Sequence, residues 1–161
     1  MIVILAGVTG CGKTVVGAAL AAACGWEFLD ADDFHPAENV AKMKSGIPLD
    51  DNDRWPWLDR LNAMLIDAER RGRNLVLACS ALKQAYRDRL TRGCGAARFV
   101  LLEGGIELIR SRLAARQGHY MNPTLLDSQF AILERPQDAL RLDVAETPAA
   151  LVHRIRREFA L

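Results

Sequence analysis

Residues 7–14 read Gly7-Val8-Thr9-Gly10-Cys11-Gly12-Lys13-Thr14, which fits the pattern G-x-x-x-x-G-K-[ST]. The run before it, Met1–Ala6, is short, apolar and rich in β-branched residues, which predicts a strand buried on both faces. The segment after it, Thr14–Cys24, is rich in alanine and is followed by Gly25, which predicts a helix. A glycine-rich loop between a strand and a helix is the setting in which this pattern binds phosphate.

This loop predicts a site for a nucleoside triphosphate. Its glycines let successive backbone N–H groups point at phosphate oxygens, and the positive end of the following helix adds to their field. In this pattern Lys13 reaches the β- and γ-phosphates of ATP as a catalytic cation, and the Thr14 hydroxyl binds Mg²⁺. The residues expected to contact ATP here are Gly7, Gly10, Cys11, Gly12, Lys13 and Thr14.

The rest of the chain alternates between strands and helices, which predicts an α/β fold built on a parallel sheet. Further strands are expected at Trp26–Leu29, Asn74–Cys79, Arg98–Leu102 and Leu140–Val144. Helices are expected at Ala37–Ser45, Trp57–Arg71, Ala81–Arg92, Ile106–Arg116, Pro123–Leu133 and Pro148–Phe159, with a polar loop at Asp50–Arg54. Neither a repeat nor a linker interrupts this pattern, so residues 1–161 are expected to form one domain.

The charge balance and the cysteines argue against several classes of protein. Lysine and arginine number 21 against 20 acidic residues, and this net charge of +1 provides no field for nucleic acid or a membrane surface. No apolar stretch approaches about 18 residues, so no membrane span is expected. The four cysteines lie far apart without a C-x-x-C pair, as in a protein of the reducing cytoplasm. We therefore expect a cytoplasmic protein with neither a nucleic-acid nor a membrane partner.

Two acidic residues follow the second predicted strand. Asp30 and Asp32 lie at its carboxyl end, which is the edge of a doubly wound sheet where ligands bind. Transfer of a phosphoryl group to an alcohol needs a carboxylate that orients the hydroxyl and takes its proton, and often a second one that holds metal-bound water. We assign Asp32 to the acceptor hydroxyl and Asp30 to Mg²⁺, with a solvated acidic turn as the alternative.

The phosphate loop alone does not separate a kinase from a GTPase, a motor or a regulatory module. The sequence contains no N-K-x-D element for reading guanine, and 161 residues are fewer than large ATPases need. These features favour a small kinase of the nucleoside-monophosphate-kinase type. A module that binds ATP without turnover is the alternative from a different class.

Further motifs are Asp30-Ala-Asp-Asp-Phe-His-Pro36, Cys79-Ser80-Ala81-Leu82-Lys83, Tyr86-Arg87-Asp88 and Ser128-Gln129-Phe130. Over about residues 2–136, this pattern resembles the gluconokinase family of shikimate-kinase-like P-loop enzymes. The resemblance implies a P-loop NTPase fold with a five-stranded parallel sheet, flanking helices and a mobile lid. It also implies a cytoplasmic homodimer that transfers phosphate from ATP to the 6-hydroxyl of D-gluconate with Mg²⁺. A kinase for another sugar acid or a shikimate-like acceptor is the alternative. The sequence departs from the family pattern at Cys11, where serine is usual, and at Ala31, where glycine is common.

On this resemblance, the acceptor-binding region is expected at about residues 30–60. The carboxylate of a sugar acid needs at least one guanidinium or ammonium group, for which Arg54, Lys83 and Arg87 are the candidates. Lys83 and Arg87 are expected on one face of the helix after the third strand, and ordinary surface cations are the alternative there. His35 follows the acidic turn and is assigned either to an acceptor hydroxyl or to ordering the loop.

A lid is expected at about residues 112–136. Arg112 and Arg116 lie four residues apart on a predicted helix, and a glycine and His119 follow them. In small P-loop kinases such a segment brings arginine over the γ-phosphate, neutralises charge in the transition state and excludes water. We assign Arg112 and Arg116 to ATP, Arg116 also to catalysis, and His119 to the acceptor, with a solvated basic helix face as the alternative. Adenine contacts are expected near the last strand and Thr147-Pro148.

Overall fold

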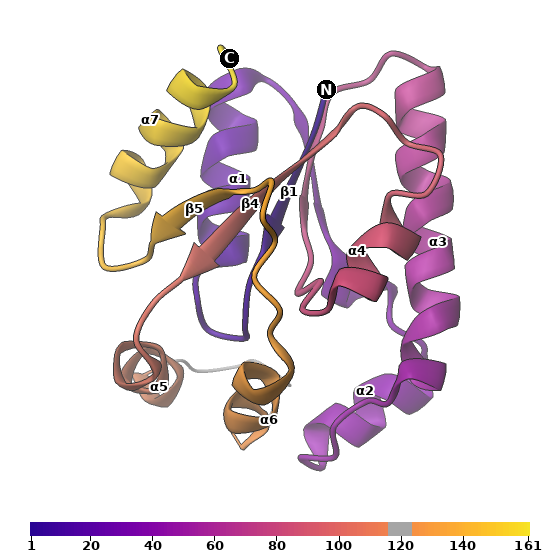
Figure 1. The fold of residues 1–161 in the computed structure, drawn as a ribbon, viewed down its shortest axis with the longest axis vertical. Coiled ribbons are helices and arrows are strands. Elements are labelled where there is room, and N and C mark those ends of the chain that lie inside the picture. Colours follow the sequence, from indigo (N-terminus) through magenta and orange to yellow (C-terminus); the bar gives the residue numbers. More distant parts are fainter. Residues whose placement is uncertain (116–123) are drawn as a thin grey trace.

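A five-stranded sheet forms the centre of the molecule (Figure 1). The computed structural model describes residues 1–115 and 124–161. Every strand pairing is parallel, and the strand order is β2-β3-β1-β4-β5. The strands are β1 (Ile2–Ala6), β2 (Glu27–Asp30), β3 (Leu75–Ala78), β4 (Ala97–Glu103) and β5 (Leu140–Asp143). The prediction of a parallel α/β sheet is confirmed.

Helices cover both faces of this sheet. In Figure 1, α1 and α7 lie on one side of it and α3 and α4 on the other. The remaining helices α2, α5 and α6 gather at the end of the molecule opposite the two termini. The helices are α1 (Lys13–Cys24), α2 (Ala37–Lys44), α3 (Asp51–Arg70), α4 (Gln84–Leu90), α5 (Ile106–Ala115), α6 (Leu125–Ile132) and α7 (Pro148–Glu158), with a short 3₁₀ helix η1 (Ala31–Phe34) after β2.

The alternation of side chains along β1 produces two separate cores. Val3 and Leu5 belong to the core that includes residues of α1 and α7, whereas Ile2 and Ile4 belong to the core that includes residues of α3 and α4. All four side chains are fully buried. Burial of a side chain of this size contributes about 1.5–3 kcal/mol relative to its exposure. An apolar run without polar interruptions is therefore what a central parallel strand needs.

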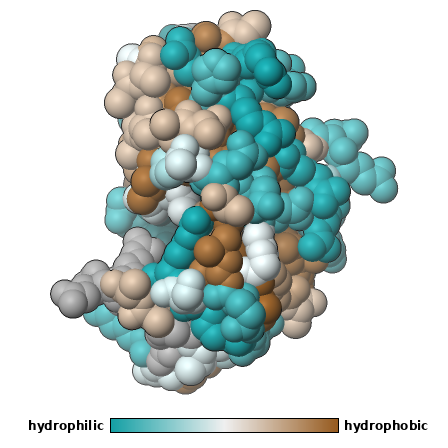
Figure 2. All heavy atoms as spheres, turned by 90° about the vertical axis from the view of Figure 1, so that its left-hand side faces the viewer, coloured by the Kyte–Doolittle hydropathy of each residue, from teal (hydrophilic) through white to brown (hydrophobic). Residues whose placement is uncertain are grey.

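The surface leaves few large apolar side chains exposed. Among the described residues, the large hydrophobic side chains that are exposed are Met1, Val15 and Ile47. Figure 2 shows the side of the molecule that carries α7 and β5, where hydrophilic and apolar residues are interspersed. None of the helices in residues 1–115 and 124–161 combines the length and the apolar character that crossing a lipid bilayer requires.

Two predicted helix boundaries are wrong. We expected a polar loop at Asp50–Arg54, but α3 begins at Asp51 because Asp50 and Asp53 form a reciprocal capping box. Pro56 lies inside this helix. The helix expected from Ala81 begins only at Gln84, since Ala81 has a left-handed backbone with φ of 40°, which no α-helix contains. As a result, Arg54 lies within α3 and Lys83 lies just before α4.

The order of the strands sets the position of that site. From β1 the chain passes to β2 on one side of the sheet, whereas from the neighbouring strand β4 it passes to β5 on the other side, so the connections diverge at the carboxyl ends of β1 and β4. Divergence of this kind opens a crevice at the edge of the sheet, where open α/β proteins bind their ligands. The loop 7–12, η1 and the segment after β3 all leave the sheet at this edge.

Candidate active site

The loop between β1 and α1 contains glycines whose backbone conformations other residues rarely adopt. A Cβ atom on Gly7 would lie 2.4 Å from the carbonyl oxygen of Leu102, and Gly7 has φ of 141°. Gly12 caps α1 with a left-handed φ of 100° and provides no side-chain cap for the helix. The first N–H groups of α1 are therefore left without a side-chain partner at the cap, which is the arrangement that receives an anion.

Lys13 and Thr14, the first two residues of α1, both point back toward this loop and the acidic turn. Lys13 Nζ donates hydrogen bonds to the carbonyl oxygens of Gly7 and Val8, at 3.0 and 2.9 Å. The Thr14 hydroxyl donates to Asp30 Oδ2 at 2.7 Å. The ammonium group is thus held across the loop, and the hydroxyl and a carboxylate are held together beside it.

Asp30 also shapes the acidic turn. Its other carboxylate oxygen, Oδ1, accepts the backbone N–H of Asp32 at 3.1 Å and caps η1. Hydroxyl and carboxylate oxygens are the hard ligands that Mg²⁺ prefers, and this ion usually takes only one or two ligands from the protein. The described residues contain no cluster of three or more His, Cys, Asp or Glu side chains suited to a metal. The pair Thr14 and Asp30 therefore fits Mg²⁺ bound together with a phosphate.

A cavity of about 370 Å³ lies over the loop. Its far wall comes from residues beyond β5, among them Val144 and Pro148. Arg112 of α5 lies in the same wall, where its Nη2 donates to the carbonyl oxygen of Val144 at 2.7 Å. The structure thus brings Arg112 and the neighbourhood of Thr147-Pro148 to the same cavity as the phosphate loop. The lining residues are Thr9, Gly10, Cys11, Gly12, Lys13, Thr14, Val15, Asp30, Asp32, Arg112, Val144, Glu146, Pro148 and Leu151.

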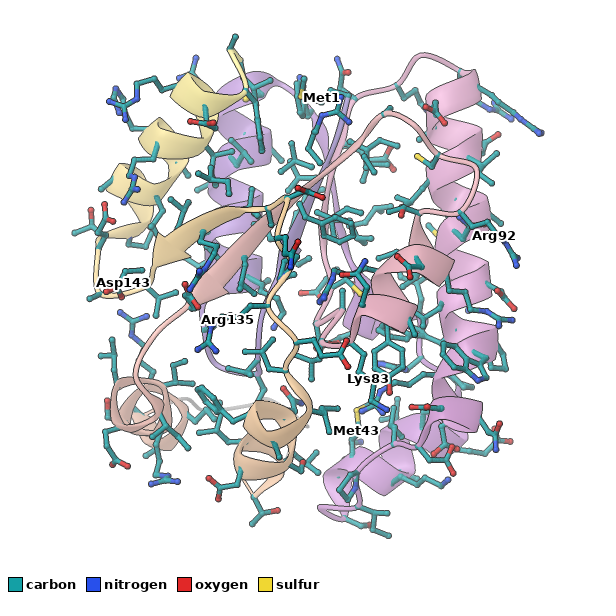
Figure 3. All side chains as sticks on the ribbon, viewed as in Figure 1. Met1, Met43, Lys83, Arg92, Arg135 and Asp143 are labelled. Atoms are coloured by element: carbon teal, nitrogen blue, oxygen red, sulfur yellow. The ribbon has the colours of Figure 1, made fainter. Side chains whose placement is uncertain are left out.

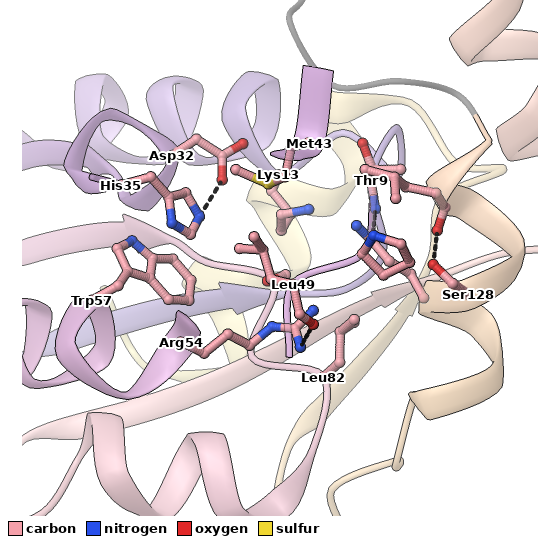
Figure 4. A pocket seen from close by; sticks show the side chains of 14 residues that line it. Thr9, Lys13, Asp32, His35, Met43, Leu49, Arg54, Trp57, Leu82 and Ser128 are labelled. Carbon is pink, nitrogen blue, oxygen red and sulfur yellow. Dashed lines mark hydrogen bonds and ion pairs between the residues drawn. The ribbon is translucent and has the colours of Figure 1, made fainter. Parts of the chain in front are cut away.

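A second, smaller cavity of about 40 Å³ adjoins the first (Figure 4). Thr9, Lys13 and Asp32 line both cavities, so these residues stand at the junction. The other walls come from η1, α2, α3, the segment after β3 and α6. Besides the three shared residues, the lining consists of His35, Met43, Pro48, Leu49, Arg54, Trp57, Ser80, Leu82, Leu125, Ser128 and Gln129.

His35 is packed tightly into this second cavity. Its ring stacks on Trp57 with the centroids 4.1 Å apart, and Trp57 Nε1 donates to the carbonyl oxygen of Ala31 at 2.9 Å. The His35 side chain is only 4% exposed, and its Nε2 lies 4.0 Å from Asp32 Oδ1 (Figure 4). Burial, with a smaller effect of the nearby Arg54 guanidinium, lowers the pKa of His35 to about 4. The ring is therefore neutral at physiological pH.

We expect His35→Gln to change how stability depends on pH. The unfolded chain binds a proton at His35 near the ordinary pKa of 6.5, whereas the folded protein binds it only near 4. The free energy of unfolding therefore decreases as the pH falls from about 6.5 to about 4, by up to about 1.4 kcal/mol per pH unit. Urea titrations across this range should show a shallower decrease in the variant. An unchanged pH dependence would mean that folded His35 titrates like the unfolded residue.

The cations predicted for the acceptor lie in different places. Arg54 extends from α3 into the second cavity (Figure 4). Lys83 precedes α4 as its N-cap, so the prediction that it lies on a helix face is wrong. In the view of Figure 3 Lys83 lies between α4 and α2, and its Nζ donates to Asp51 at 2.9 Å. Lys83 lines a neighbouring cavity that also has Arg54 in its wall.

Arg87 does not reach either cavity. It is 2% exposed, so the alternative of a surface cation is wrong as well. Its Nη1 donates to the carbonyl oxygens of Ala81 and Leu82 at 2.8 and 3.0 Å, and Nε and Nη2 donate to Gln84. The guanidinium instead holds the segment between β3 and α4, where the left-handed Ala81 exposes these carbonyls.

Gln129 contacts the phosphate loop, a role that was not predicted from the sequence. Its Oε1 accepts the backbone N–H of Thr9 at 2.7 Å, across 120 residues of sequence. This bond joins α6 to the phosphate loop at the junction of the cavities. A glutamine on a helix gives no local signal for such a contact, apart from its place in the motif 128–130.

Cys79 follows β3 and is fully buried. Desolvation raises the pKa of its thiol to about 12, so the thiol keeps its proton.

Several predicted residues of the lid fall outside the description. Arg116 and His119 lie in residues 116–123, which the structure does not describe. The expected lid at 112–136 is therefore described only in α6 and at its two ends. Within α6, Leu125 packs against Met43 of α2 and Leu49. This cluster joins the lid segment to the acceptor-binding region.

Comparison with known proteins agrees with this geometry. A family model described as an AAA domain matches residues 2–136. A probable gluconokinase of Xenopus tropicalis is 43% identical, covering 98% of this chain and 93% of that protein. The thermosensitive gluconokinase of Escherichia coli (strain K12) is also 43% identical, covering 96% of this chain and 84% of that protein. This chain belongs to the gluconokinase family.

A solved structure leads to the same family. The crystal structure of a gluconokinase from Sinorhizobium meliloti 1021 superimposes with a TM-score of 0.83 at 38% identity, covering 98% of this chain and 94% of that one. A gluconokinase brings two substrates together, which agrees with two cavities that share Lys13 and Asp32. One cavity has the phosphate loop as its floor, and the other contains the polar residues that follow β2.

Proposed function

We propose that this protein transfers the γ-phosphate of ATP to the 6-hydroxyl of D-gluconate. The observation that carries the proposal is the junction at which Thr9, Lys13 and Asp32 line both cavities. A phosphoryl donor in the larger cavity and an alcohol in the smaller one would meet there. The gluconokinases that are 43% identical over nearly the whole chain support gluconate as the acceptor.

Asp32 is the proposed base of the reaction. Its carboxylate orients the 6-hydroxyl and takes its proton as the bond between O6 and the γ-phosphorus forms. The bond between that phosphorus and the oxygen that bridges to the β-phosphate breaks, and ADP leaves with the electron pair. Lys13 neutralises the charge that accumulates on the phosphate oxygens. The neutral ring of His35 lies 4.0 Å from Asp32 and places no positive charge there that would make the carboxylate a weaker base.

Thr14 and Asp30 are the proposed holders of Mg²⁺. Their oxygens already lie 2.7 Å apart, which supports a shared ligand at this point. When bound, the ion neutralises phosphate charge and orients the β- and γ-phosphates. The chain itself fixes the loop, the lysine and the base around it.

Binding of the acceptor requires the second cavity to widen. Its volume of about 40 Å³ is far below the volume of about 370 Å³ of the cavity over the phosphate loop. Leu125, Met43 and Leu49 line this space and form one apolar cluster, so we propose that α6 moves away from α2 when gluconate enters. We propose that the segment 112–136 acts as the lid, with Arg116 on the γ-phosphate and His119 on the acceptor. A closed lid excludes water, which would otherwise accept the phosphate.

The cytoplasm is the proposed compartment. All four cysteines are free thiols, and Cys11, Cys79 and Cys94 are buried. Free thiols without a disulfide framework are typical of reducing compartments. A homodimer stays a prediction from the family resemblance.

A panel of acceptors tests the proposed activity. We expect ADP release with gluconate to exceed that with shikimate or glucose by at least about 10²-fold in kcat/KM, because shikimate lacks the open polyol and glucose lacks the carboxylate. The measurement is a coupled assay with the three compounds side by side at equal ATP. A preference for shikimate or for a different sugar acid would replace gluconate as the acceptor. Binding of ATP without product from any acceptor would indicate a regulatory module.

A further inference from the structure

A buried hydroxyl connects the acceptor cavity to a second charged cluster. Tyr86 of α4 is 2% exposed, and its hydroxyl lies between two side chains of α3. The hydroxyl donates to Asp51 Oδ1 and accepts a hydrogen bond from Arg54 Nη1 at 3.1 Å. Burial and the bond to Asp51 both raise the pKa of Tyr86, so the phenol keeps its proton. It therefore has one fixed donor direction and one fixed acceptor direction.

The contact with Tyr86 engages one particular nitrogen of Arg54. Arg54 Nη1 also donates to the carbonyl oxygen of Leu49, and the guanidinium carbon lies 5.1 Å from the centroid of the Tyr86 ring. Both hydrogen bonds that Arg54 makes to described residues use Nη1. Nε and Nη2 therefore stay available as the two parallel donors that bind a carboxylate. Arg54 lines the acceptor cavity.

Asp51 anchors the arrangement from the other side. Its carboxylate accepts from Tyr86 and from Lys83 Nζ, the latter at 2.9 Å. These two bonds lower the pKa of Asp51, with the bond from Tyr86 as the larger cause. Lys83 Nζ also lies 5.2 Å from the centroid of the Tyr86 ring. The ionised carboxylate fixes the phenol as a donor toward α3, which leaves its lone pair for Arg54.

We propose that Tyr86 is a positioning residue that orients Arg54 for the carboxylate of the acceptor, with Asp51 as its anchor. The inference rests on the proposed function, because it assigns the acid end of gluconate to Arg54 and the hydroxyl end to Asp32. Arg54 lies in the wall shared by the acceptor cavity and an adjoining cavity of about 470 Å³ that also contains Lys83. An extended sugar acid with its 6-hydroxyl at Asp32 has room for its carboxylate on this side.

Tyr86→Phe tests the proposal because it removes one oxygen and keeps the ring against Arg54 and Lys83. We expect the KM for gluconate to rise about tenfold, as for the loss of one hydrogen bond to a charged group. The kcat should stay within about twofold and the KM for ATP should not change. Glucitol, which has a hydroxymethyl group in place of the carboxylate, serves as a competitive inhibitor. Its inhibition constant should not change, because it makes no use of the oriented guanidinium.

Two aspartate variants complete the experiment. Asp51→Asn keeps the shape of the anchor without its charge and should raise the KM for gluconate in the same direction, by about threefold. Asp59→Asn is the matched control, since Asp59 also lies on α3 and forms an ion pair with Arg89 of α4 outside both cavities. It should leave the KM for gluconate unchanged.

The outcomes separate three cases. An unchanged KM for gluconate in Tyr86→Phe, or an equal loss of affinity for gluconate and glucitol, would overturn the positioning role. If Tyr86→Phe does not fold, the comparison of Asp51→Asn with Asp59→Asn decides in the same way, since equal effects would overturn it. A wild-type protein that does not phosphorylate gluconate would instead contradict the proposed function, before any variant is compared.

Discussion

Lys13→Ala is expected to abolish turnover, with kcat lower by about 10³-fold or more. The ammonium group is held over the loop by the carbonyls of Gly7 and Val8, at the junction of the two cavities. Among the described residues, no other lysine or arginine lines both cavities. Its removal leaves the developing charge on the γ-phosphate without its nearest compensation from the protein. The measurement is ADP release at saturating ATP and gluconate.

The fold should survive this change. Lys13 is partly exposed at the start of α1, and alanine has a high helix propensity there. Lys44→Ala is the matched control, since Lys44 is exposed at the end of α2. Both variants should keep the melting temperature of the wild type within a few degrees. A kcat within tenfold of the wild type in Lys13→Ala would show that the lysine only helps to bind ATP.

Elements with local signals were predictable from the sequence. The strand β1 and the helices α1 and α7 match their predicted ranges to within one residue. An uninterrupted apolar run, a glycine after the last turn and Pro148 at the first turn are signals that neighbouring residues carry by themselves. The parallel sheet followed from their alternation, because successive parallel strands need a helical connection.

Elements that depend on distant contacts were not predictable. The start of α3 was placed after Pro56, since a proline inside a helix usually marks a boundary, but the capping box of Asp50 and Asp53 begins the helix earlier. Arg87 was expected to bind the acceptor, with an ordinary surface cation as the alternative, whereas in the structure it is buried against backbone carbonyls. The carbonyls that bury it are turned inward by the left-handed Ala81, which has no signature in the sequence.

The candidate site divides in the same way. Lys13, Asp30 and Asp32 could be named because they follow strands whose carboxyl ends meet at one edge of the sheet. Tyr86 and Gln129 were given no role, because their partners are 35 and 120 residues away in the sequence. Contacts between segments so far apart in the sequence depend on the packing of the whole domain.

Asp32→Asn is expected to lower kcat by about 10²–10⁴-fold and to leave the affinity for ATP nearly unchanged. The amide has the size of the carboxylate and still accepts a hydrogen bond from the 6-hydroxyl, but it does not take up the proton. ATP is expected to contact the loop and Lys13, which this substitution does not alter. The measurements are kcat by ADP release and ATP binding by titration calorimetry. Asp33→Asn is the control, because Asp33 is the next residue, is exposed and lines neither cavity.

The same experiment separates the roles of Asp30 and Asp32, which the sequence places only two residues apart. The Thr14 hydroxyl contacts Asp30, and we therefore assign the metal ion to this pair, whereas Asp32 lies near His35 and lines the acceptor cavity. The loss in Asp32→Asn should therefore persist at saturating Mg²⁺. If high Mg²⁺ restored kcat, the carboxylate of Asp32 would belong to the metal site, and the base would have to be sought elsewhere in the acceptor cavity.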